Sequence, residues 1–531
     1  MATAVHPAIG ASAPAADVVE DKYKYKYLIA IAVTMAAMLE LIDTSIVNVA
    51  IPHMMGNLGA TLDEISWVST GYIIANVIII PMSGWLAAYF GRRRYLTGSI
   101  MIFVASSFFC GAAHTLFGLV FWRVVQGLGG GALLSTAQST LWEAFPPKEV
   151  GIGQAMFGVG VMVGPTLGPT LGGYIVDNFD WPWIFYINLP LGLIAGLMVW
   201  SYVRNSELHQ KATSVDWLGI GLLTTGVGAL QWMLERGERY DWFESRFVTV
   251  LGVTALVSFV WLIYHELTTE EPVINFRVLH SRQLATGVAM ASLLGFALFG
   301  SVFVLPVFLQ GLHGFTANQT GLVILPGAIS SAITMAVLGR FASRFDARPL
   351  IIIGVLGFLW CMWRLSLLSY DSGADDLFWP LVARGVSLGL IFIPLTGASM
   401  AELEPWQIPQ GTGMFNLMRQ LGGSMGIAIV ATLLSRFTAQ SKSVLTEHVG
   451  MIDPNVLARV DGISRAMVAR GMNPASAHAM ALRMIDRSVG AQASVLAFSK
   501  IYILSGVTLC CAIPLMLFWK HGKGRAAVQA H

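Results

Sequence analysis

Long apolar runs are the feature that most constrains how this chain can fold. A helix that crosses a bilayer needs about 20 mostly apolar residues, and fourteen runs of roughly that length are separated by charged segments. They cover residues 28–51, 66–89, 95–113, 116–141, 151–176, 183–203, 216–234, 247–265, 285–310, 317–338, 349–369, 377–400, 411–434 and 498–519. The pattern predicts an all-α integral membrane protein with fourteen transmembrane helices.

The composition agrees with a lipid bilayer as the main solvent. Only 12% of the 531 residues are charged, whereas soluble domains have about a quarter. The net charge of +2 gives no sign of a nucleic-acid partner. The four cysteines lie in apolar runs without disulfide or metal-ligand spacing, so we interpret them as core thiols and expect no metal site.

The distribution of basic residues predicts the orientation. Seventeen Lys and Arg fall on one side of the fourteen runs, and the short loops of the other side hold only Arg236, Arg239 and Arg246. Cytoplasmic loops carry the excess of basic residues, so tails 1–27 and 520–531 are expected in the cytoplasm. Segment 435–497 is then periplasmic. The first run has no small-residue cleavage site and is expected to be retained.

A weak internal repeat divides the chain into two halves. Residues 84–94 and 339–349 match at the ends of the second and tenth runs, and Arg123 and Arg384 occupy matching places two runs later. The offset of eight helices preserves orientation, so the repeat is parallel. It predicts six-helix bundles at 28–203 and 276–519, with two inserted helices and linkers at 204–275. Parallel halves around a central site are typical of alternating-access carriers.

Two carboxylates lie in the middle of the first run. Glu40 and Asp43 share one helix face, and our assignment places no other carboxylate in the hydrocarbon. Ionisable groups there are costly and usually mark a transport pathway. Arg123, in F-W-R-V-V-Q-G of the fourth run, is the natural partner. The acids are either a structural pair neutralised by Arg123, or a site that binds a proton or attracts a cationic compound. The second bundle has Arg384 but no matching acid.

Four motifs resemble those of a known family. Residues 84–94 are similar to the loop signature of the major facilitator superfamily, and 160–173 to the glycine-proline run of its antiporters. Residues 42–52 and 181–192 resemble motifs of the fourteen-helix drug:proton antiporter (DHA2) branch. The resemblance spans essentially the whole chain and is to the EmrB/QacA type. It is nearest to its EmrB-like members, because segment 435–497 is long and helical in pattern.

The resemblance assigns roles to residues of this chain. Proton coupling falls to Asp43 first, with Glu40 and Arg123. The gating motif comprises Gly84, Gly91, Arg92, Arg93 and Arg94, with Ala88 where the family has an acid, which puts the usual charge lock in doubt. The arginines could equally be positive-inside anchors. The antiporter motif comprises Gly160, Gly164, Pro165, Gly168, Gly172 and Gly173, which either only pack tightly or also limit leak.

Two features have more than one interpretation. Arg364 and Arg419 are candidates for substrate contact or for a structural role, half-buried at helix ends. Segment 435–497 carries apolar residues at helical spacing on both sides of a break near Gly471. It is either a cap over the outer vestibule or a docking site for a membrane-fusion adaptor.

The sequence therefore predicts a proton-driven exporter of small hydrophobic or toxic compounds in the bacterial inner membrane. The resemblance implies the permease of an EmrAB-type tripartite system, with an adaptor and an outer-membrane channel. An exporter of one metabolite or siderophore is the alternative. No catalytic or phosphate-binding motif points to an enzyme or an ATP-driven pump, so no cofactor is expected and the proton gradient is the energy source. A channel would need neither the buried acids nor the repeat.

Overall fold

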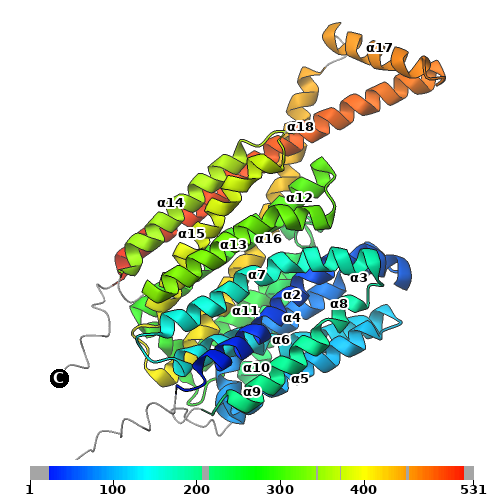
Figure 1. Cartoon of the computed structure of the whole chain (residues 1–531). Coiled ribbons are helices and arrows are strands. Elements are labelled where there is room, and N and C mark those ends of the chain that lie inside the picture. The colour runs from blue at the N-terminus through cyan, green and yellow to red at the C-terminus, as the bar shows by residue number, and fades with distance from the viewer. Residues whose placement is uncertain (1–22, 206–214, 342–344, 371, 450–453, 520–531) are drawn as a thin grey trace, which may run out of the picture.

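Membrane-spanning helices account for most of the structure (Figure 1). The computed structural model describes residues 23–205, 215–341, 345–370, 372–449 and 454–519. In these ranges fourteen helices are long and apolar enough to cross a membrane, and the regular structure is entirely helical. The predicted all-α membrane fold is confirmed. Most of the predicted tail 1–27 and the tail 520–531 lie outside the described residues.

Each half of the chain contributes six spans, with two more between the halves. The first six are α2 (Lys26–Leu58), α4 (Trp67–Phe90), α5 (Arg92–Gly111), α6 (Leu116–Ala144), α7 (Val150–Asn178) and α9 (Asn188–Tyr202), with short helices α3 (Leu62–Ile65) and α8 (Trp183–Tyr186). The inserted pair is α10 (Trp217–Arg236) and α11 (Arg246–Thr268). The last six are α12 (Arg282–His313), α13 (Ala317–Phe341), α14 (Ala347–Ser366), α15 (Ala374–Met400), α16 (Ile408–His448) and α18 (Pro474–Cys510), which leads into α19 (Ala512–Leu515).

The internal repeat is visible in the packing. In the first half α2 packs on α7, α6 packs on both α4 and α5, and α5 packs on α9. The second half repeats these pairs as α12 with α16, α15 with both α13 and α14, and α14 with α18. The halves meet where α7 contacts α13 and α4 contacts α16. Two six-helix bundles with an inserted pair are therefore confirmed as the architecture.

Glycines allow the halves to approach closely at the end of the bundle where α2 begins. A Cβ at Gly84 would lie 3.1 Å from the backbone of Pro409 in α16, and a Cβ at Gly339 would press on the Gly151 carbonyl of α7. The two contacts are related by the repeat. Small residues at these points are what permit helix backbones to meet in a membrane.

The glycine-proline run of α7 packs along α2. Gly160, Gly164, Gly168 and Gly172 recur every fourth residue, and a Cβ on any of them would overlap an atom of α2. Gly173 instead faces α13, where a Cβ would lie 3.4 Å from the Asn318 nitrogen, and Pro165 is half-buried in the same helix. Helix α7 thus bridges its own bundle and the other one. The row of glycines along α7 explains the tight packing against α2. The predicted role of this motif in limiting leak stays a prediction.

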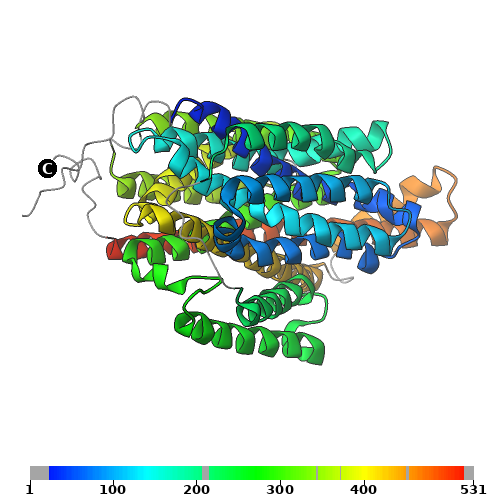
Figure 2. The ribbon, with the colours of Figure 1, turned by 90° about the horizontal axis from the view of Figure 1, so that it is seen from below.

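The inserted pair lies alongside the two bundles, as the green helices at the lower edge of Figure 2 show. Helix α10 packs on α4 and α16, whereas α11 packs mainly on α10. The Arg236 guanidinium donates to Asp63 at 2.9 Å, and the Trp242 indole donates to Thr432 at 3.0 Å. The pair is therefore attached to both halves.

The described residues of the predicted outside segment, 435–449 and 454–497, form a long helical arm. Helix α16 continues to His448 and α18 begins at Pro474, so both spans extend far beyond their predicted limits of 434 and 498. Few helix-breaking residues interrupt these stretches. The break near Gly471 is confirmed: its φ is +90°, and it separates α17 (Pro454–Val468) from α18. Figure 1 shows the arm projecting away from the bundle, and its role as a cap or as a docking site stays a prediction.

We predict that Gly164→Val destabilises the protein by about 1–3 kcal/mol, because the added side chain collides with Leu41 in a filled interface. Thermal unfolding in detergent should show a lower melting temperature. Gly221→Val is the matched control, since a Cβ there meets nothing within 4 Å. Equal melting temperatures for the two variants would contradict the packing argument.

Candidate functional site

A buried ion pair joins α2 to α6. The Arg123 Nη1 lies 2.5 Å from the Asp43 Oδ2, and the two side chains are 1% and 0% exposed. The pair lies among membrane-spanning helices, where an unpaired charge is costly. The structure thus brings together the two residues that the sequence analysis selected on different helices.

The other Asp43 oxygen accepts two amide donors. Gln126 Nε2 and Asn188 Nδ2 each lie 2.9 Å from Asp43 Oδ1. Both amides also donate to the Ser107 hydroxyl, at 3.1 and 3.0 Å, and Ser107 donates to the Phe185 carbonyl. This network connects α2, α5, α6 and the start of α9. The negative charge of Asp43 is therefore compensated by three donors.

Arg123 makes further contacts besides its ion pair with Asp43. Its Nε donates to the Val68 carbonyl at 3.0 Å, and its Nη1 also donates to Gln126 Oε1 at 2.7 Å. The guanidinium stacks over the Tyr72 ring, with 4.1 Å from Cζ to the ring centroid. Such a pair can neutralise a buried acid and can also respond to its protonation, so the geometry accommodates both interpretations.

Glu40 belongs to a separate network although it shares a helix face with Asp43. Asn76 Nδ2 donates to Glu40 Oε1 at 2.9 Å, while Oε2 has no hydrogen-bond partner among the described residues. The side chain is buried. Glu40 is thus the less compensated of the two acids.

The neighbouring network crosses between the two halves. Asn416 Nδ2 of α16 donates to Gln138 Oε1 of α6 at 2.6 Å. Arg419, one turn further along α16, interacts electrostatically with Glu40 but forms no ion pair with it. Its Nε and Nη1 have no hydrogen-bond partner in the described part of the chain. Opposite charges from the two halves are therefore both buried and keep unused hydrogen-bonding capacity.

The structure separates the two candidate arginines that we predicted to be half-buried at helix ends. Arg419 is 1% exposed and lies well inside α16, so that expectation was wrong for it. Arg364 is exposed in the last turn of α14, away from the buried networks. Arg384 is buried in α15, and its Nη1 has no partner among the described residues.

The predicted gating motif surrounds the turn from α4 to α5. Gly91 has a φ of +85°, which favours glycine, and Gly84 contacts α16. Arg92 makes two hydrogen bonds to Glu143 at the end of α6, at 2.8 and 2.5 Å. The Arg93 guanidinium stacks on Trp200, and Arg94 is exposed. An ion pair within the first bundle is thus present although Ala88 replaces the acid of the family motif.

Several residues of the two networks were missed from the sequence. Gln126 lies three residues after Arg123 in the motif of the fourth run, and Asn188 lies in the motif 181–192. The sequence analysis named both motifs but assigned no role to these two amides. Asn76, Gln138 and Asn416 belong to no such motif. Each of them is an amide side chain inside an apolar run. An amide in a membrane helix needs a hydrogen-bond partner, and this need could have marked the three residues as members of a buried network.

With these networks in place, comparison with known proteins identifies the family. The family model described as Major Facilitator Superfamily matches residues 33–427. The chain belongs to the major facilitator superfamily. It is accordingly a multi-pass membrane transporter rather than an enzyme, as predicted.

Relatives of this superfamily member place it near the EmrB type. It is 35% identical to the multidrug export protein EmrB of Escherichia coli K12 over 81% of this chain and 84% of that one. It is 31% identical to the fatty acid resistance protein FarB of Neisseria gonorrhoeae, over 92% and 95% of the two chains. The human organic anion transporter MFSD10 has the same fold, with a TM-score of 0.58, 13% identity, and coverage of 91% and 99%.

We predict that Arg123→Leu costs about 3–5 kcal/mol of stability, because it leaves the Asp43 charge buried without its partner. The double variant Asp43→Asn, Arg123→Leu should recover part of the loss, since no net charge then remains. Melting temperatures in detergent measure both effects. Arg364→Leu, at an exposed position, is the control and should change stability by less than about 0.5 kcal/mol. A double variant as unstable as the single one would contradict the ion-pair account.

Proposed function

We propose that this chain exports hydrophobic, toxic compounds in exchange for protons, by alternating access of its two bundles. The observation that carries the proposal is the buried Asp43–Arg123 pair in a major facilitator fold. Titratable groups inside a membrane bundle are usually part of an ion or proton pathway. The names of the relatives, multidrug export protein and fatty acid resistance protein, support hydrophobic compounds as cargo.

Proton binding at Asp43 would act on the packing of the first bundle. The ionised carboxylate accepts hydrogen bonds from Arg123, Gln126 and Asn188, which hold α2 against α6 and α9. A proton on Asp43 removes the charge that Arg123 neutralises, so the pair loses most of its attraction. The buried guanidinium then needs a new partner or water. This change would favour a different arrangement of the helices and so couple protonation to the exposure of the central site.

Glu40 and Arg419 are our candidates for contact with the exported compound. They lie on opposite halves, are buried, and keep unpartnered polar atoms. A compound between the halves would contact both, whereas Arg364 is too exposed to do so. Glu40 could also bind a second proton.

The proposed orientation places both termini in the cytoplasm and the helical arm in the periplasm of a bacterial inner membrane. The excess of basic residues supports it. The turn with Arg92, Arg93 and Arg94 then faces the cytoplasm, and the contacts of Gly84 and Gly339 lie on that side.

The arm is the proposed docking site for a membrane-fusion adaptor that continues to an outer-membrane channel. It extends α16 and α18 beyond the bundle, and α17 packs against α18 (Figure 1). Leu457, Val468, Met480 and Met484 are between 38% and 43% exposed on it. Exposed apolar side chains on a projecting element are typical of protein contact sites.

We predict that Asp43→Asn abolishes proton exchange in proteoliposomes. Addition of a hydrophobic efflux substrate should release protons from wild-type vesicles, and the variant should match protein-free vesicles because residue 43 no longer titrates. Arg123→Ala should also lose the coupling. Asp177→Asn, an exposed position at the end of α7, is the control and should retain exchange. Full proton-driven efflux by Asp43→Asn would refute the proposed site.

We predict that removal of the arm abolishes adaptor co-purification and leaves the carrier folded. Lys442 and Asp486 form an ion pair of 2.8 Å between α16 and α18, so residues 443–485 can be replaced by a short Gly-Ser linker at that point. Purification after co-expression with a membrane-fusion adaptor tests the interaction, and thermal unfolding checks the fold. Retained co-purification would exclude the arm as the docking site.

A further inference from the structure

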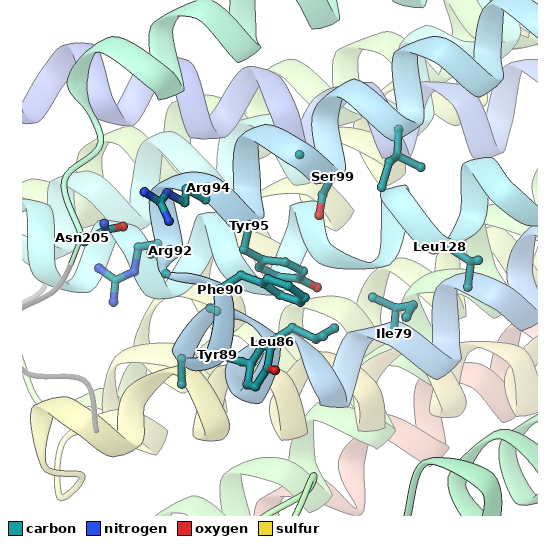
Figure 3. Close-up of a pocket in the computed structure, with 15 residues that line it drawn as sticks. Ile79, Leu86, Tyr89, Phe90, Arg92, Arg94, Tyr95, Ser99, Leu128 and Asn205 are labelled. Carbon is teal, nitrogen blue, oxygen red and sulfur yellow. The ribbon is translucent and has the colours of Figure 1, made fainter. Parts of the chain in front are cut away.

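A crevice on the outer surface of the first bundle is separate from the buried networks. It lies between α4, α5 and α6 and has a volume of about 760 Å³ (Figure 3). Phe90, Ile102 and Leu128, which line it, are 53%, 48% and 43% exposed. Exposed apolar side chains on membrane-spanning helices face lipid, so the crevice is open to the bilayer.

Polarity changes along the crevice. Arg92, Arg94 and Asn205 line one end, and Ile79 and Leu128 the other, as Figure 3 shows. The lining contains no Asp or Glu. This order matches a phospholipid, which has a charged headgroup at the membrane edge and an acyl chain toward the centre.

The depth of the crevice matches one leaflet. Arg94 and Ile102 are separated by about 12 Å along α5, and Ile79 and Phe90 by about 16 Å along α4, at 1.5 Å per residue. The hydrocarbon core of a bilayer is about 30 Å thick, so one leaflet is about 15 Å deep. The chain has crossed the membrane twice, in α2 and in α4, when it reaches the α4–α5 turn. This turn forms the basic end of the crevice, which therefore lies on the side of the membrane at which α2 begins.

The charges at the basic end are only partly used within the protein. Arg92 pairs with Glu143, and the Arg93 guanidinium stacks on Trp200 at 4.1 Å. Arg94 forms no ion pair with any described residue. The first turn of α5 contains no acid, although the positive end of the helix dipole lies there. An anion near Arg94 would therefore be stabilised by both the guanidinium and the helix terminus.

Space for an acyl chain is available beside Gly98. Gly98 lines the crevice, is exposed, and a Cβ there would meet nothing within 4 Å. A larger side chain could fill this space without disturbing a neighbouring helix.

We propose that this crevice binds an anionic phospholipid of the leaflet that surrounds the α4–α5 turn. Its phosphate contacts Arg94, and one acyl chain lies along Gly98, Ile102 and Leu128. The site is independent of which compound the protein transports and of whether protons drive the transport.

The test is lipid retention by the full chain. The protein is extracted from nanodiscs of equal phosphatidylglycerol and phosphatidylcholine, and the lipid that remains bound is measured by native mass spectrometry. Wild-type protein should retain phosphatidylglycerol preferentially. Arg94→Gln should reduce that preference about fivefold, the effect of one basic residue near a membrane surface. Gly98→Leu should reduce retention through loss of space.

Two matched variants control for general effects. Gly221→Leu adds the same side chain at an equally open position on α10, and Arg340→Gln removes an exposed arginine at the end of α13. Both should retain lipid like the wild type. Equal retention of the two lipids by wild-type protein, or unchanged retention by Gly98→Leu, would overturn the proposal. Displacement of the lipid by glycerol phosphate or by a hydrophobic efflux compound would also overturn it, in favour of a free-anion site or a drug pathway.

Discussion

The buried pair of Asp43 and Arg123 is the interaction on which the first bundle depends. Either charge alone would be expensive among membrane-spanning helices, and removal of one partner from such a pair is strongly destabilising. The surrounding amides and the Ser107 hydroxyl extend the pair to four helices. A change of protonation at Asp43 would therefore alter the hydrogen bonds that join α2 directly to α6 and α9.

The two halves share their packing but not their charges. The same helix pairs recur in both bundles, because packing needs only apolar faces and small residues at close approaches. Arg384 occupies the place of Arg123, yet no carboxylate of the second bundle faces it in the part of the chain that the structure describes. The first half thus holds Glu40 and Asp43, whereas the second half contributes the buried Arg419. The two bundles are therefore similar in helix packing but different in their buried charged residues.

Helices were easier to predict than their ends. Every expected span is present, because about 20 apolar residues in a bilayer have few alternatives to a helix. The ends of α16 and α18 were misplaced, since the hydrophobic signal stops at the membrane edge whereas the helix continues into water. Asp43 and Arg123 were selected because charge in hydrocarbon is conspicuous. Asn416 and Gln138 were not, because a single amide in an apolar run says nothing about which helix will supply its partner.

The sequence by itself determined the number of spans, the parallel repeat, the family motifs and the selection of Asp43 and Arg123. Each of these depends on local composition or spacing, which the chain carries whatever its neighbours are. Tertiary structure decided which donors surround Asp43, why Glu40 lies in a different network one turn away, and that Arg419 of the other half is buried. It also decided that the α4–α5 turn borders a crevice and that the arm projects. These depend on contacts between residues far apart in the chain, and only the packed helices fix those contacts.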